Sequence, residues 1–165
     1  MLLQWIYGKP VVIRYPRGQE AKEKIEKQEK IELGKAEILQ KGKDITILAI
    51  GKMVEKAIKV AKKLEKEKKE VEIINVRFLK PLDEETILQS IQKTKKVITI
   101  EDNILTGGLA SHVERLLIEH PIENVKLQTY GWKDNFVEHG KVEELETLYG
   151  LDVESITSKV KELFY

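Results

Sequence analysis

The chain has 165 residues, 41% of them hydrophobic, and its 29 Lys and Arg nearly balance its 28 Asp and Glu. The net charge of +1 excludes binding of nucleic acid by charge alone, because phosphate binding needs a clustered basic excess. Cys is absent, which excludes disulfides and thiolate chemistry, and no stretch approaches the roughly 20 apolar residues that span a bilayer. We expect one cytoplasmic globular domain plus a short arm, with no nucleic-acid or membrane partner.

The chain begins with an apolar segment followed by a charged one. Residues 1–10 resemble the tail of a helix cut from something larger, and Lys9-Pro10 ends that helix. Residues 11–13 are predicted as a short strand. Residues 19–33 carry too few apolar side chains to bury a face, so we interpret them as a linker. The main domain is then predicted to cover residues 34–165.

Strands alternate with helices along the main domain. Residues 36–40 and 44–50 flank a Lys-Gly-Lys turn, which predicts a hairpin and one antiparallel edge strand. Further strands are expected at residues 71–79, 97–100 and 125–130. One helix is expected to begin after Pro81, with Asp83 as its cap. The other helices are expected at residues 54–69, 106–120, 142–149 and 152–164. The alternation predicts an α/β fold, a three-layer, open, mostly parallel sheet with one antiparallel edge strand.

The most informative stretch joins the strand at residues 97–100 to the helix expected to start at Thr106. Glu101, Asp102 and Asn103 follow the strand, at the sheet edge where open α/β proteins bind ligands. The Glu101-Asp102 pair fits acid-base chemistry, although such pairs more often bind backbone amides or a neighbouring domain. Both alternatives stay open.

Glycine and hydroxyl groups at the start of that helix have two interpretations. Gly107-Gly108 at a helix start admits an anion, or else lets the helix lie close to the sheet or to another domain. Ser111 lacks the flanking glycines of a nucleophile elbow, so we interpret it as structural.

Other familiar sites are absent from the sequence. There is no G-x-G-x-x-G and no G-x-x-x-x-G-K-[ST] motif, so neither phosphate cradle is available. His112, His120 and His139 have no metal-ligand spacing, and surface or core roles are favoured for them. Arg14 and Arg17 give the best ligand hypothesis, because guanidinium groups suit phosphate and the Pro16-Gly18 turn holds them stiffly. Structural ion pairs are the competing interpretation of the two arginines.

Five motifs in order resemble the carboxyl-terminal part of the 1-deoxy-D-xylulose-5-phosphate synthase family. They are Arg14-Tyr15-Pro16-Arg17-Gly18, residues 75–83 (NVRFLKPLD), Glu101-Asp102-Asn103 with Gly107-Gly108, residues 134–140 (DNFVEHG) and residues 148–152 (LYGLD). The wider group contains transketolases and the beta subunits of 2-oxo acid dehydrogenases. The first two motifs favour the synthase.

The resemblance implies a transketolase C-terminal-like fold and a role in a larger enzyme. Such synthases are dimers that use thiamine diphosphate and Mg²⁺ to condense pyruvate with glyceraldehyde 3-phosphate, for isoprenoid and thiamine biosynthesis. The segments that hold the cofactor and metal in that family are not in this sequence, so we expect no cofactor in this chain. Residues 1–18 match the end of the pyrimidine-binding domain, and Arg17 matches an arginine that holds the substrate phosphate. Arg14 is its neighbour.

The isolated chain is therefore expected not to be an enzyme by itself, and its partners are expected to be the remaining domains and, in the complete enzyme, a second subunit. Two positions depart from the family pattern: Asp102 replaces a commoner Glu, and Trp132-Lys133 replaces a usual Leu-Pro. Three alternatives stay open. They are a separately encoded subunit, a domain of a 2-oxo acid dehydrogenase beta subunit, and a non-catalytic interaction module.

Overall fold

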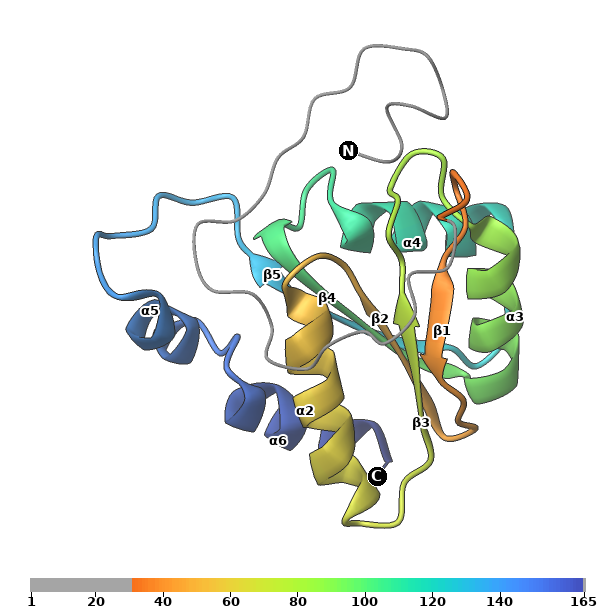
Figure 1. Cartoon of the computed structure of the whole chain (residues 1–165), viewed down its shortest axis with the longest axis horizontal. Coiled ribbons are helices and arrows are strands. Elements are labelled where there is room, and N and C mark those ends of the chain that lie inside the picture. The colour runs from red at the N-terminus through yellow and green to blue at the C-terminus, as the bar shows by residue number, and fades with distance from the viewer. Residues whose placement is uncertain (1–30, 165) are drawn as a thin grey trace. The chain divides into compact units, whose positions relative to one another are not determined.

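The computed structural model describes residues 31–164 and contains a five-stranded sheet between two layers of helices (Figure 1). The strands are β1 (Glu37–Gln40), β2 (Ile45–Ala49), β3 (Val71–Asn75), β4 (Lys96–Ile104) and β5 (Lys126–Trp132). Their order across the sheet is β1-β3-β2-β4-β5, with β1 antiparallel to β3 and all other neighbours parallel. The predicted fold class, including the antiparallel edge strand, is confirmed.

The predicted hairpin is wrong, because β1 pairs with β3 and not with β2. The short link between β1 and β2 crosses the start of β3, where the backbone N–H groups of Lys43 and Asp44 donate to the Glu70 carbonyl at 3.2 and 2.9 Å. A Cβ on Gly42 would lie 2.3 Å from the Val71 carbonyl carbon, so only glycine fits this crossing. Strand β3 therefore inserts between β1 and β2.

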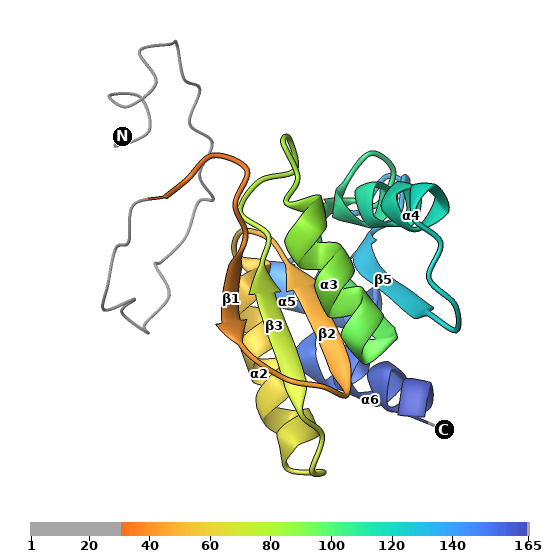
Figure 2. The same ribbon diagram turned by 90° about the vertical axis from the view of Figure 1, so that its right-hand side faces the viewer.

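The helices divide between the two faces of the sheet. On one face, α2 (Met53–Glu65) and α6 (Val153–Lys161), continued by the short 3₁₀ helix η1 (Glu162–Phe164), pack on β2, β3 and β4. On the other face lie α3 (Glu84–Thr94) and α4 (Leu109–Glu119). Figure 2 views the sheet from the α3 side and shows α2 behind the strands.

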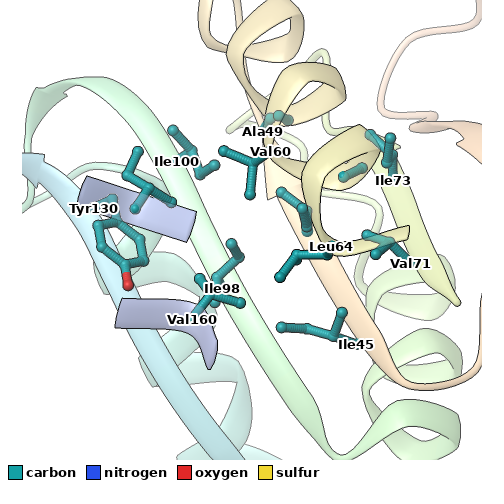
Figure 3. Packing of buried hydrophobic residues seen from close by; sticks show 14 of the residues in the cluster. Ile45, Ala49, Val60, Leu64, Val71, Ile73, Ile98, Ile100, Tyr130 and Val160 are labelled. Carbon is teal, nitrogen blue, oxygen red and sulfur yellow. The ribbon is translucent and has the colours of Figure 1, made fainter. Parts of the chain in front are cut away.

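Each face has its own apolar core. Figure 3 shows Ile45, Ile98 and Ile100 from the sheet meeting Leu64 of α2 and Val160 of α6. Burial of these branched side chains on both faces explains why the central strands are near-continuous apolar runs, as parallel strands require.

The capping residues agree with the sequence at α3 and differ at α4. Asp83 caps α3 by accepting from the Thr86 backbone N–H at 3.2 Å, as predicted. Gly108, and not Thr106, is the N-cap of α4, and because glycine has no side chain, the capping group must come from another residue. Strand β4 also continues through residues 101–103, which were expected to follow it. Both differences arise at the junction described in the next subsection.

Helix α5 (Val142–Leu148) differs from the other helices because none of its residues is buried. It follows the long loop after β5 and lies at the far left of Figure 1. Within residues 31–164, no helix is both long enough and apolar enough to cross a bilayer.

Candidate functional site

The carboxyl ends of the parallel strands meet at one edge of the sheet, and the strand order changes direction there between β2 and β4. From β2 the chain moves to β3 on one side, whereas β4 lies on the other side. Such a switch point is the usual ligand position in open α/β sheets. We therefore take this edge as the candidate site.

An ion pair at the switch point joins β4 to the residue before α2. The Lys52 Nζ lies 2.8 Å from Asp102 Oδ2, and the Trp132 indole N–H donates to Asp102 Oδ1 at 2.9 Å. Burial by itself raises the pKa of Asp102, but the hydrogen bonds from Lys52 and Trp132 outweigh burial and hold that pKa below its usual value. The two positions that depart from the synthase pattern, Asp102 and Trp132, are thus hydrogen-bonded to each other.

Glu101, the neighbouring carboxylate, points to the other face and is completely buried. Its Oε2 accepts from the Leu109 backbone N–H at 2.8 Å, and its Oε1 accepts from the Ala110 N–H at 2.9 Å. Burial raises the pKa of Glu101, and the two amide hydrogen bonds offset only part of that increase. Glu101 therefore caps α4 from β4, in agreement with the amide-binding alternative for this residue.

The two glycines before α4 have different roles. A Cβ on Gly108 would lie 2.0 Å from Glu101 Oε2, so the carboxylate reaches the helix only because position 108 has no side chain. Gly107 has a φ of +75°, and nothing lies within 4 Å of its hypothetical Cβ. The anion at this helix start is the chain's own Glu101, and the close approach is that of a side chain from the sheet.

Ser111 stabilises the same turn. Its Oγ accepts from the Gly107 backbone N–H at 3.0 Å and donates to the Leu105 carbonyl at 2.8 Å. Both partners are backbone groups of the loop before α4, so the structural interpretation of Ser111 holds.

A chain of contacts leads from the switch point to the loop after β5. The Trp132 ring packs edge-on against Tyr149, with 5.5 Å between ring centroids, and the Tyr149 hydroxyl donates to Glu138 Oε2 at 2.8 Å. This hydrogen bond raises the pKa of Tyr149. The pKa of Glu138 is lowered, first by its own backbone N–H and then by Tyr149. These contacts connect Asp102 of β4, through Trp132 and Tyr149, to Glu138 in the loop after β5.

The remaining predicted residues are two arginines and three histidines. Arg14 and Arg17 lie outside the described residues. His112 lies in α4, His120 at its end and His139 in the loop before α5. Across residues 31–164, no three His, Asp or Glu side chains converge to hold a metal ion.

Sequence reasoning missed Lys52 and the role of Trp132. Lys52 directly follows Gly51 at the end of a predicted strand, which was a usable signal for the same sheet edge as Asp102. Trp132 gave no such signal, because its contact with Asp102 depends on how β5 pairs with β4.

The lowered pKa of Asp102 predicts a pH dependence of stability. Because the folded-state pKa is below the unfolded one, the stabilisation by Asp102 is present above the unfolded pKa of about 3.9 and is lost as the pH falls through the folded pKa. Asp102→Asn is expected to lower the free energy of unfolding by about 0.5 kcal/mol near pH 7, since the pair is partly exposed. Urea unfolding at pH 7 and pH 3 measures this difference. A difference that grows at pH 3 would contradict the assignment.

Comparisons with known proteins match this chain to one domain family and to one group of enzymes. The family model described as "Transketolase, C-terminal domain" matches residues 34–156. The 1-deoxy-D-xylulose-5-phosphate synthase of Caldanaerobacter subterraneus subsp. tengcongensis is 40% identical over 94% of this chain and 25% of its own length. That of Clostridium perfringens is 41% identical over 99% of this chain and 27% of its own length. The chain thus spans about a quarter of the length of these relatives.

Two solved structures show the same architecture. A structure described as a split gene transketolase, inactive beta4 tetramer, has a TM-score of 0.73 and 33% identity, covering 80% of this chain and 43% of that chain. A transketolase mutant from Pichia stipitis has a TM-score of 0.56 at 16% identity, covering 77% of this chain and 17% of that one. The second likeness concerns the fold alone.

Proposed function

The chain belongs to the family of transketolase C-terminal domains, and from this membership we propose that it is the carboxyl-terminal domain of a 1-deoxy-D-xylulose-5-phosphate synthase. The observation that carries the proposal is the alignment of nearly the whole chain with synthases at about 40% identity. The complete enzyme would use thiamine diphosphate and Mg²⁺ to condense pyruvate with glyceraldehyde 3-phosphate, releasing carbon dioxide. It would be a homodimeric transferase that supplies isoprenoid and thiamine precursors.

The chain is proposed to contain three parts. Residues 1–18 would be the end of the pyrimidine-binding domain, residues 19–33 the linker, and residues 34–165 the C-terminal domain. The start of the family match at residue 34 supports the second boundary. In this arrangement the chain supplies assembly surface and the arginine that binds the substrate phosphate, Arg17, with Arg14 beside it.

A separately encoded subunit is the second candidate. The neighbour described as a split gene transketolase shows that transketolases occur in that form, and this chain is a third identical to it. In this case the chain would associate with a longer partner that carries the cofactor site. Mixing the chain with that partner and recovering synthase activity would distinguish this candidate from a non-catalytic module. Binding of a lipoyl domain would instead favour a 2-oxo acid dehydrogenase.

The isolated chain is expected neither to bind thiamine diphosphate at micromolar concentrations nor to decarboxylate pyruvate. The polar groups at the sheet edge already have partners within the chain, because Glu101 binds the amides of α4 and Asp102 binds Lys52. A diphosphate bound at these two positions would have to break these contacts. Isothermal titration calorimetry with thiamine diphosphate and Mg²⁺ tests this, with a complete synthase as the positive control. Micromolar binding by the isolated chain would overturn the proposed division of labour.

A further inference from the structure

Residues 133–148 carry apolar side chains that the rest of the domain does not cover. Phe136 is fully exposed, and the exposed fractions of Val142 and Leu148 are 54% and 68%. We call these three residues the Phe136 surface. Single exposed apolar side chains are ordinary, but here three large ones fall within residues 136–148, and such a concentration of exposed apolar residues marks protein-protein contacts.

This segment is held in place although it is barely packed. Lys56 Nζ lies 2.9 Å from Glu146 Oε1 and donates to the Leu151 carbonyl at 2.6 Å. The Lys56 and Glu146 side chains are only 13% and 14% exposed, so this pair is well shielded from water. Together with the hydrogen bond from Tyr149 to Glu138, it fixes the segment at residues 138 and 146. A surface that is fixed before binding loses less entropy when a partner docks.

The charge of the segment narrows the choice of partner. Residues 133–148 contain five carboxylates and two lysines. Lys56 neutralises one of the carboxylates, Glu146, which leaves a net charge of −2 in a chain whose net charge is +1. Two copies docking through the same surface would place like charges against each other, which is unfavourable. The complementary partner therefore has an apolar site flanked by Lys or Arg.

We propose that the Phe136 surface docks onto the remainder of the synthase, which makes up about three quarters of each relative and is absent from this chain. The inference rests on the proposed function, since that function defines the remainder. Phe136 would be the buried aromatic anchor, and the surrounding carboxylates would meet the basic rim. The Lys56–Glu146 pair would act as a positioning contact.

The test uses a complete enzyme in which this whole chain replaces the matching region of the Caldanaerobacter subterraneus synthase. In the joined enzyme, amide hydrogen exchange of residues 133–148 is expected to be roughly tenfold slower than in the isolated chain, as for a hot-spot contact. Phe136→Glu and Leu148→Glu should each abolish this protection. Ile118→Glu, on α4 and 78% exposed, is the matched control and should retain it. None of the three substitutions should change the melting temperature of the isolated chain.

The outcomes separate the two proposals. An active joined enzyme in which residues 133–148 exchange as fast as in the isolated chain, or in which Phe136→Glu has no effect, overturns the docking proposal only. An inactive unsubstituted joined enzyme overturns the proposed function and the docking proposal with it. If sedimentation shows that the isolated chain is a dimer that Phe136→Glu dissociates, the occupant is a second copy and the proposal is wrong.

Discussion

Gly108→Ala is expected to lower the free energy of unfolding by about 3 kcal/mol, a large effect for the addition of one methyl group. The new Cβ would lie 2.0 Å from Glu101 Oε2 and 2.6 Å from the Ile104 carbonyl oxygen. The carboxylate must then leave the amides of Leu109 and Ala110, although the Glu101 side chain is fully buried. An unpaired buried carboxylate and two unpaired N–H groups account for the expected loss.

The adjacent glycine provides the matched control. Gly107 has open space around its hypothetical Cβ but a φ of +75°, a conformation that Asn tolerates better than other side chains. Gly107→Asn is therefore expected to change the free energy of unfolding by less than about 1 kcal/mol. Urea unfolding of the full chain compares the two variants. If Gly108→Ala is as stable as Gly107→Asn, the account of Glu101 as an internal helix cap is wrong.

The sequence was sufficient to predict elements whose signals are local. Asp83 follows Pro81 and precedes an apolar helical repeat, so its role as the cap of α3 was readable from a few residues. The apolar β2, β3 and β4 runs likewise predicted a sheet covered on both faces. In these cases propensity, pattern and tertiary structure agree.

The order of the strands at the sheet edge was not readable in the same way. The Lys-Gly-Lys turn suggests pairing of its own flanks, but the hydrogen bonds from residues 43 and 44 go to Glu70. A local turn signal contains no information about a strand that arrives thirty residues later and inserts between the two flanks. Pairing of β1 with β3 was therefore beyond a local argument.

At the candidate site, the sequence predicts where the two carboxylates lie but not which residues they contact. The position of Glu101 and Asp102 at the carboxyl edge follows from the strand pattern. Their opposite surroundings do not, because alternate residues of a strand point to opposite faces and meet different elements. Glu101 meets the start of α4, whereas Asp102 meets Lys52 and Trp132. Two adjacent carboxylates thus have pKa values shifted in opposite directions.

Arg17→Ala in the complete enzyme is expected to lower kcat/KM for glyceraldehyde 3-phosphate by roughly 10- to 100-fold, while the KM for pyruvate stays nearly unchanged. The expectation follows from the proposed match of Arg17 to the phosphate-binding arginine of the synthases. Loss of charge-assisted hydrogen bonds to a phosphate costs about 1.5–3 kcal/mol, which corresponds to that range. Because pyruvate has no phosphate, its binding does not involve this guanidinium. Steady-state kinetics with each substrate varied in turn measures the difference.

Removing the phosphate from the substrate gives the sharpest control. With unphosphorylated glyceraldehyde, the complete enzyme and its Arg17→Ala variant should have equal kcat/KM, because the contact is then absent from both. Arg17→Lys keeps the positive charge but loses the planar fork, so an intermediate loss is expected. A loss with glyceraldehyde as large as that with its phosphate would mean that Arg17 supports the fold or the cofactor site. In that case Arg14, which lies three positions earlier in the sequence, is the next residue to test, by the same pair of substrates.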